Sequence, residues 1–227
     1  MYDIVFISYH EPNAEENFND LYDRYNTVGI WGDRVKRIKN VEGIHNAHVQ
    51  AAKLAKTSYF FVVDGDAEIM KDFKFSYTTD EKDFVHVYRS SNPINDLTYG
   101  YGGVKLLPTT LTLDMDTTTN DMTTSISNKF KVMNEVSNIT SFNTDPFSTW
   151  KSAFRECAKL SSKTIQGQKN DETEKRLYTW TTVGHDRPFG EYALAGATAG
   201  MEFGLSRGSD LRLINDFDWL RKQFNEH

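Results

Sequence analysis

Cysteine is nearly absent from this sequence: Cys157 is the only one among 227 residues. A single cysteine excludes a disulfide framework and any zinc site built from several cysteines. No apolar run approaches the ~20 residues that cross a bilayer, and the opening residues, Met-Tyr-Asp-Ile-Val-Phe-Ile, lack a basic lead-in. We therefore expect no membrane span and no signal peptide, and a chain that folds in a reducing compartment, the cytoplasm.

Acidic residues outnumber basic ones. The 26 Lys and Arg residues against 32 Asp and Glu give a net charge of −6 and a pI near 5.5, which excludes a basic coat held on nucleic acid mainly by phosphate neutralisation. The charge is uneven, because residues 33–56 hold six basic and only two acidic residues. This segment is either a face for a polyanion or an ordinary solvated surface. Aromatic residues are plentiful at 13%, which indicates a globular core.

The first half of the chain alternates apolar runs with helical patterns. The runs predict strands at 3–9, 27–31, 59–63, 84–88 and 104–107. Small and apolar residues recur at helical spacing over 14–25 and 43–56. The order strand, helix, strand, helix, strand predicts an α/β fold with a mostly parallel central sheet.

The second half has a different character. Residues 109–128 hold eight threonines and three aspartates with no Lys or Arg, a composition that predicts an irregular surface loop. Helical patterns follow at 147–166, 171–182, 188–204 and 210–226. We expect one compact unit with a soft boundary near residue 112, which divides it into 1–112 and 113–227.

The clearest candidate site is Asp64-Gly65-Asp66, directly after an apolar strand. Ligands of parallel sheets bind beyond the carboxyl ends of the strands, and two carboxylates there make a hard-oxygen site for Mn²⁺ or Mg²⁺. Gly65 lets the chain turn sharply and lets a ligand approach. The alternative is an ordinary turn at the end of a strand.

The segments 43–52 and 56–66 together resemble the core of GT-A glycosyltransferases of the family 2-like type. The resemblance implies a GT-A fold in which 1–112 binds a UDP-sugar and 113–227 binds the acceptor. It implies metal ligands at Asp64 and Asp66. It also implies contacts with the nucleotide-sugar from Asp64 and Gly65, from the end of the first strand, and from the second helix, namely at Ser8, Tyr9, Glu11, His45 and Asn46. Asn46 matches the family's asparagine, whereas His45 stands where an arginine is usual.

A glycine-rich segment, Tyr99-Gly100-Tyr101-Gly102-Gly103, precedes the strand at 104–107. Glycines allow close approach of a flat ligand, and tyrosines stack on sugars or bases. In the resembled family such a turn lines the donor sugar and the acceptor, which implies roles for Gly102 and Gly103. A glycine-rich hairpin with two surface tyrosines is the alternative. Asp96 either contacts a sugar hydroxyl or caps its own loop.

Two further residues are candidates from the same resemblance. Asp145 matches the carboxylate that acts as general base in inverting members of the family. The sequence Asp145-Pro146 is also a strong helix-start signal in its own right. His185 is the candidate third metal ligand, although most lone histidines are not ligands.

The segments around 142–157 and 187–200, together with 99–107, resemble glycosyltransferase-like proteins of T4-like bacteriophages. That resemblance implies a sugar acceptor in phage DNA, 5-hydroxymethylcytosine, with the host cytoplasm as the place of action. Two alternatives stand beside it. One is the same chemistry on a polysaccharide or protein acceptor, and the other is a non-enzymatic phage protein that keeps a nucleotide-binding fold.

Overall fold

The computed structural model divides the chain into two compact units. It describes residues 1–30, 32–100, 102–119, 121–163, 169–207 and 211–226. The first unit is Met1–Ser91 with Thr98–Ser141, and the second is Asn92–Leu97 with Phe142–His227. The main division thus falls after Ser141 and not near residue 112, because residues 130–140 form a strand that returns to the sheet of the first unit.

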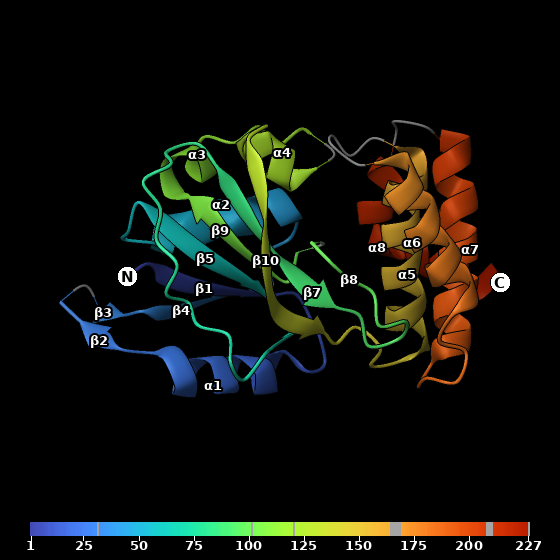
Figure 1. Ribbon diagram of the computed structural model, residues 1–227, viewed down its shortest axis with the longest axis horizontal. Coiled ribbons are helices and arrows are strands. Elements are labelled where there is room, and N and C mark those ends of the chain that lie inside the picture. The colour runs from blue at the N-terminus through green and yellow to red at the C-terminus, as the bar shows by residue number, and fades with distance from the viewer. Residues whose placement is uncertain (31, 101, 120, 164–168, 208–210, 227) are drawn as a thin grey trace. The chain divides into compact units, whose positions relative to one another are not determined.

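The first unit is built on one eight-stranded sheet of order β4-β1-β5-β9-β7-β10-β6, with β8 paired to β7 (Figure 1). The strands are β1 (Asp3–Ser8), β4 (Val35–Lys39), β5 (Tyr59–Asp64), β6 (Ala67–Ile69), β7 (Val85–Ser91), β8 (Thr98–Tyr99), β9 (Val104–Pro108) and β10 (Phe130–Thr140). β4, β1, β5, β7 and β10 share one direction, and β9, β6 and β8 oppose them. The predicted α/β class with a mostly parallel sheet is confirmed.

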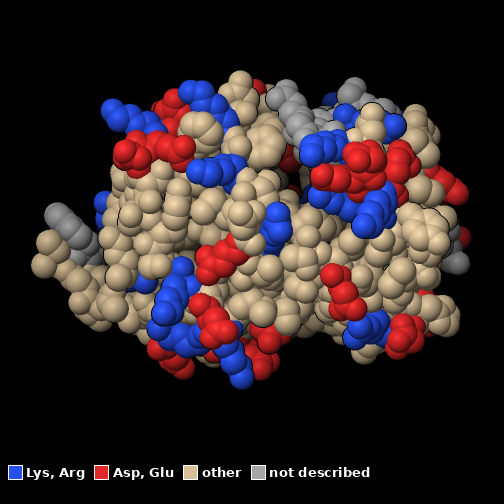
Figure 2. Space-filling view, in the orientation of Figure 1, with Lys and Arg blue, Asp and Glu red and all other residues tan. Residues whose placement is uncertain are grey.

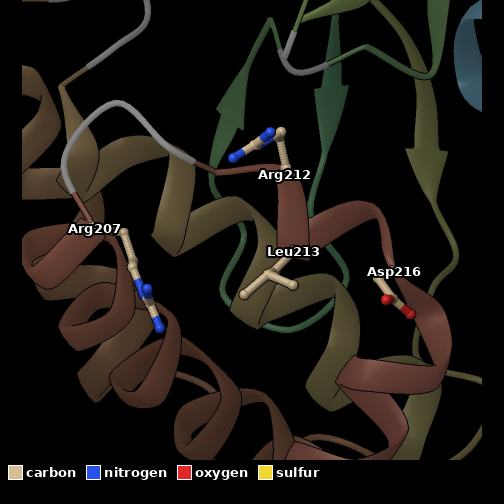
Figure 3. Close-up of a pocket in the computed structure, with 4 residues that line it drawn as sticks. All are labelled: Arg207, Arg212, Leu213 and Asp216. Atoms are coloured by element: carbon tan, nitrogen blue, oxygen red, sulfur yellow. The ribbon is translucent and has the colours of Figure 1, made fainter.

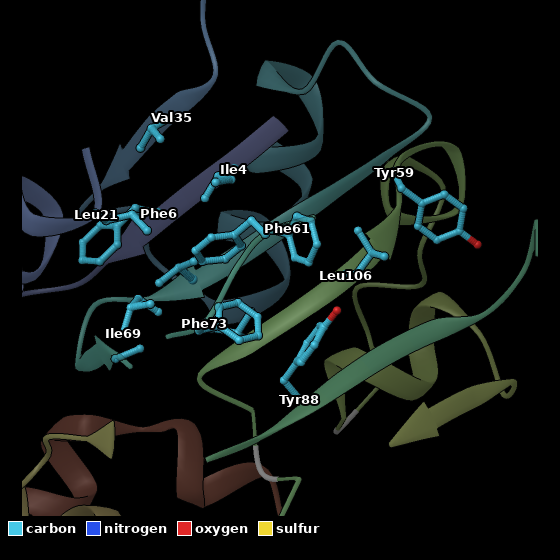
Figure 4. Packing of buried hydrophobic residues seen from close by; sticks show 14 of the residues in the cluster. Ile4, Phe6, Leu21, Val35, Tyr59, Phe61, Ile69, Phe73, Tyr88 and Leu106 are labelled. Atoms are coloured by element: carbon cyan, nitrogen blue, oxygen red, sulfur yellow. The ribbon is translucent and has the colours of Figure 1, made fainter. Parts of the chain in front are cut away.

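Alternating side chains of the buried strands point to opposite faces of this sheet. Ile4 and Phe6 of β1 belong to the cluster that packs on α1 (Ala14–Tyr25), which Figure 4 shows together with Leu21. Val5 belongs to the cluster on the other face, with the small residues of α2 (Ile44–Leu54). The helices therefore cover both faces, as a parallel sheet requires.

The chain reverses direction across the sheet around β1. From β1 it passes through α1 to β4 on one side, and from β4 through α2 to β5 on the other side of β1. Open α/β sheets bind ligands at such a reversal, outside the carboxyl ends of the two strands that flank it. Here these strands are β1 and β5. In this sheet Ile7 of β1 lies in register with Asp64 of β5.

Two predicted segments differ from the structure. Residues 27–31 were expected as one strand, but β2 (Val28–Gly29) and β3 (Gly32–Asp33) form a separate two-stranded hairpin; Trp31 lies outside the described residues. Within 109–128, expected to be irregular, lie the short helices α3 (Thr109–Leu113) and α4 (Met122–Ile126). Met115, Met122 and Ile126 are buried in the hydrophobic cluster on the face of the sheet that α2 covers, and they anchor this segment there.

The second unit is helical apart from its connections. Its elements are α5 (Pro146–Ser162), α6 (Asn170–Thr182), α7 (Gly190–Arg207), the 3₁₀ turn η1 (Arg212–Asn215) and α8 (Phe217–Glu226). The first three match predicted helices, although the expected extension of α5 over 164–166 lies outside the described residues. The predicted helix at 210–226 is interrupted at Asp216, whose carboxylate accepts a hydrogen bond from the Trp219 amide at 2.9 Å. Among the helices that the structure describes, none has the length and apolar character needed to cross a bilayer.

Close packing of α5 on α7 depends on glycine. A Cβ at Gly200 would collide with the Phe154 carbonyl oxygen, and one at Gly196 with that of Trp150.

We expect Gly200→Ala to lower the free energy of unfolding by about 1–3 kcal/mol, because the helix backbones must move apart. Urea titration measures the effect. The control is Thr198→Ala, an exposed position on α7, for which a change within about 0.5 kcal/mol is expected. Equal effects of the two variants would contradict this account.

Candidate functional site

The candidate site lies where β1 and β5 end. Beyond β1 the chain turns at His10, which has a left-handed φ of 63°, and continues to Glu11. Beyond β5 it enters the turn Asp64-Gly65-Asp66. Because the two parallel strands are neighbours in register, these two turns leave the same edge of the sheet. Acidic side chains thus lie at the ends of both strands, Glu11 after β1 and Asp64 at the last residue of β5.

The two turns contact each other at Gly65. A Cβ at Gly65 would lie 2.5 Å from Glu11 Oε2 and 3.1 Å from Ser8 Cβ. Glu11 Oε2 also accepts a hydrogen bond from the Tyr9 amide at 2.6 Å. Asn17 of α1 donates its side-chain amide to the Gly65 carbonyl at 3.0 Å. The structure therefore brings together four of the expected residues, Ser8, Tyr9, Glu11 and Gly65, and only glycine leaves room for the Glu11 carboxylate.

Asp64 has a cationic partner that the sequence reasoning missed. Lys105 of β9 places its Nζ 3.3 Å from Asp64 Oδ2 and also donates a hydrogen bond to the Gly102 carbonyl. The Lys105 residue is only 8% exposed. The available signal was a lysine inside the otherwise apolar run Val104–Leu107, since a charge buried in a strand needs a partner.

The glycine-rich turn makes room for the protein's own side chains. Gly102 has a φ of +105°, and a Cβ there would lie 2.8 Å from Lys105 Cε. A Cβ at Gly103 would collide with the buried Asn138 amide, and the Gly103 carbonyl accepts a hydrogen bond from the Asp64 amide at 2.9 Å. Tyr99 is buried, which differs from a hairpin with two surface tyrosines, and Tyr101 lies outside the described residues.

Asp66 is half-buried, and its carbonyl accepts a hydrogen bond from the Ser141 amide at 2.7 Å. In the part of the chain that the structure describes, no three His, Cys, Asp or Glu side chains form a group that could hold a metal ion. Mg²⁺ is commonly bound by one or two carboxylates together with substrate phosphates and water. Asp64 and Asp66, two carboxylates with one residue between them, fit that kind of donor set.

His45 and Asn46 lie on the first turn of α2. Nε2 of half-buried His45 is 3.3 Å from the Thr119 hydroxyl. Burial lowers the pKa of His45, and the charges of Asp121 and Asp116 oppose that effect in part. Asn46 is exposed and donates to the Glu42 carbonyl at 3.3 Å. Both expected binding residues are thus engaged with neighbouring loops of the first unit.

Four of the six bases in the basic segment 33–56 have acceptors within the first unit. Arg34 donates to the carbonyls of Tyr2 and Phe75, and Lys36 pairs with Asp3 at 2.7 Å. Arg37 and Lys39 both pair with Glu15, and their hydrogen bonds lower the pKa of that carboxyl to about 2. Figure 2 shows basic and acidic side chains in small mixed groups on the face it presents.

Asp145, the candidate base, belongs to the second unit and caps α5. Its Oδ1 accepts from the Ser148 amide at 2.9 Å, and its Oδ2 accepts from the Ser148 hydroxyl at 2.6 Å. Burial raises the pKa of Asp145, but the hydrogen bonds from Ser148 and Thr144 outweigh it and lower the pKa overall. The residue is therefore ionised at neutral pH, and it caps the N-terminus of α5.

Asp96 and His185 also belong to the second unit. Asp96 has a φ of 56° and pairs through Oδ2 with Arg187 at 2.9 Å. His185 is exposed on the turn between α6 and α7. The other proposed metal ligands, Asp64 and Asp66, belong to the first unit.

A pocket of about 470 Å³ in the second unit is lined by Arg207, Arg212, Leu213 and Asp216 (Figure 3). Two guanidinium groups and one carboxylate give it a mixed polar lining around an apolar side chain. None of the residues expected from the sequence lines it.

No protein-family model and no curated protein matches this chain.

A buried histidine on α2 makes the first unit sensitive to acid. His48 Nδ1 donates to the Ile44 carbonyl at 2.8 Å, and Nε2 has no hydrogen-bond partner among the described residues. Burial above all, followed by the charge of Lys105, lowers its pKa from 6.5 to about 4. Because the unfolded chain takes up this proton more readily, stability present at neutral pH is lost as the pH falls from 6.5 to 4.

We expect the free energy of unfolding to fall by about 2 kcal/mol between pH 7 and pH 5 through His48 alone. In His48→Gln that part of the pH dependence disappears. Urea titrations at the two pH values measure it, with His10→Gln, an exposed histidine, as the matched control. An unchanged pH dependence in the His48 variant would show that this residue does not carry it.

Proposed function

We propose that the chain is a GT-A-type, family 2-like glycosyltransferase that moves a sugar from a UDP-sugar to an acceptor hydroxyl. The observation that carries the proposal is the pair of acidic turns at the carboxyl ends of β1 and β5, where the strand order reverses. Nucleotides bind to α/β sheets at such reversals. Glu11, Gly65 and Asp64 lie at this edge, which supports the resemblance from which the activity is inferred.

The proposal includes a divalent ion, Mn²⁺ or Mg²⁺, held by Asp66 and Asp64, with His185 as the further ligand that the resemblance suggests. Such an ion, when bound, stabilises the negative charge of the departing diphosphate. The chain's own part is to fix the carboxylates. The Gly103 carbonyl and Lys105 hold Asp64 through its amide and its side chain, and Ser141 holds the backbone of Asp66.

Asp145 is the proposed general base. The acceptor oxygen would bond to the anomeric carbon as the bond from that carbon to the diphosphate breaks, and the hydroxyl proton would pass to Asp145. In-line displacement of this kind inverts the configuration of the sugar. The carboxylate is ionised at neutral pH, as a base must be.

The preferred acceptor is 5-hydroxymethylcytosine in phage DNA within the host cytoplasm, on the resemblance to proteins of T4-like phages. One observation favours a second candidate, a polysaccharide or protein acceptor. Arg34, Lys36 and Arg37 of the basic segment are engaged by acceptors of the first unit, which leaves fewer cations for DNA phosphates.

The deciding experiment measures UDP release with Mn²⁺ across a panel of UDP-sugars. Each donor is offered with hydroxymethylcytosine DNA, with unmodified DNA and without DNA. Release that requires the modified DNA supports the preferred acceptor and identifies the donor. Release that ignores DNA supports the second candidate. If UDP is not released and metal-dependent UDP binding is also absent, the enzyme proposal is overturned and the non-enzymatic protein is the alternative that stands.

Asp66→Asn is expected to reduce turnover at least about 100-fold, since the loss of a metal ligand removes several kcal/mol of charge stabilisation. Metal-dependent UDP binding, followed by calorimetry, should fall with it. The fold should survive, because the hydrogen bond to Ser141 uses the backbone carbonyl of Asp66. Asp83→Asn is the control: it removes a carboxylate of the same unit from an exposed pair with Lys129. Near-normal turnover of the Asp66 variant in EDTA would contradict a metal mechanism.

Asp145→Asn separates the base from the helix cap, because asparagine caps helices about as well as aspartate. We expect turnover to fall about 100-fold or more, in line with the loss of a general base, while donor binding and the melting temperature stay near wild type. Asp145→Ala loses both roles and should also unfold more easily, by about 1 kcal/mol. Full turnover in the asparagine variant would remove Asp145 from the site.

A further inference from the structure

A buried polar cluster lies within the sheet of the first unit, where β7 pairs with β10. Its members are the side chains of Ser90, Ser137 and Asn138, each 0% exposed, and of Thr140, which is 8% exposed. Asn138 Oδ1 accepts hydrogen bonds from the Ser90 hydroxyl at 2.9 Å and from the Ser137 hydroxyl at 2.8 Å. Its Nδ2 donates to the Thr140 hydroxyl at 3.2 Å. Asn138 is therefore the residue to which the other three are bonded.

An irregularity of β10 brings these side chains together. Val136 pairs with Arg89 and Asn138 pairs with Ser90, so β10 has one residue more than β7 over this stretch. Neighbouring side chains of a regular strand point to opposite faces, whereas those of Ser137 and Asn138 are bonded to each other. Bulges of this kind redirect side chains and are frequent next to active sites.

One route of hydrogen bonds leads from Asn138 to Asp64. The Ser90 hydroxyl, which donates to Asn138, accepts a hydrogen bond from the Gly103 amide at 3.2 Å. The Gly103 carbonyl in turn accepts one from the Asp64 amide at 2.9 Å. A Cβ at position 103 would collide with the Asn138 side chain, so glycine is needed for the two to lie this close. The end of β5 is thus tied to Asn138 through two residues.

A second route leads from Asn138 to Asp66. The side chain of Thr140 is bonded to Asn138, and its backbone pairs with Ala67 of β6. The next residue, Ser141, donates its amide to the Asp66 carbonyl at 2.7 Å. Both carboxylate-bearing residues of the turn after β5 are thus held, through their backbones, by segments that contact one buried amide group.

We propose that Asn138 is a positioning residue, which fixes the placement of Asp64 relative to Asp66. A buried network whose members all have partners makes the backbone that it joins rigid. A binding site needs such support behind the groups that touch the ligand. Asn138 itself touches no ligand in this scheme, because its side chain is fully buried. That the two carboxylates bind a ligand rests on the proposed function, whereas their placement by Asn138 rests on the hydrogen bonds alone.

The test is amide hydrogen exchange of the full chain, measured by NMR. Asn138→Leu keeps a branched side chain of similar shape and loses every hydrogen bond of the amide group. The internal reference is the Ile4 amide, which donates to the Arg34 carbonyl. Relative to it, exchange of the Asp64 and Ser141 amides should become about tenfold faster, because the support of both is lost. A residue that only stabilises the fold would change all three rates by the same factor.

Two single variants separate the two routes, and they also serve if Asn138→Leu does not fold. Ser90→Ala cuts the first route and should speed exchange of the Asp64 amide while the Ser141 amide keeps its rate. Thr140→Val cuts the second route and should have the opposite effect. Each variant removes one buried hydroxyl and no charge, so neither alters the electrostatics of the site.

Thr112→Val is the matched control. It removes a fully buried hydroxyl of the same unit, one that donates to the Pro108 carbonyl at 2.8 Å. The relative exchange rates of the three amides should stay at their wild-type values. In the UDP-release assay, Asn138→Leu should lower turnover per folded molecule about tenfold, since misplaced site groups slow the reaction, whereas Thr112→Val should not change it.

Equal acceleration at all three amides, or none, overturns the inference even if the wild type releases UDP. Faster exchange in the turn with unchanged turnover also overturns it, because the reaction would then not depend on this placement. If the wild type neither releases nor binds UDP, the proposed function fails on that result alone. Faster exchange confined to the Asp64 and Ser141 amides would still support the placement by Asn138.

Discussion

The parallel pairing of β1 with β5 is the contact on which the rest of the first unit depends. Both strands are buried on both faces, and their register sets Ile7 beside Asp64. Just beyond these paired residues, the turns that follow the two strands contact each other through Gly65 and Glu11. A slip of this register by one residue would move every side chain of β5 to the opposite face. It would also separate the two acidic turns.

The sequence predicted the parts of the fold that have a local pattern of apolar residues. Apolar runs and helical spacing located β1, α1, α2 and β5, and the alternation of these elements was enough for the α/β class. β10 was missed because its sequence, Phe130–Thr140, is mostly polar and gains its place by pairing with β7 and β6. Long-range pairing of that kind leaves no periodic signal in the chain.

The candidate site shows the same limit at the level of single residues. Asp64-Gly65-Asp66 was visible as a motif after a strand. The partner of Asp64 was not, because Lys105 lies 41 residues further along and reaches it only through the sheet. Glycines read as room for a ligand turned out to leave room for Lys105 and Asn138. A glycine signals that something is close, and only the fold tells what.

The second unit contains a piece that comes from the middle of the first. Residues Asn92–Leu97 belong to it, and Ile94 from that piece is buried in its core beside Leu177 and Trp180. The chain thus enters the second unit, returns to the sheet and enters it again. No single cut in the chain separates the two units with their cores intact, so a protein truncated after Ser141 would keep Ile94 but lose the core residues that bury it.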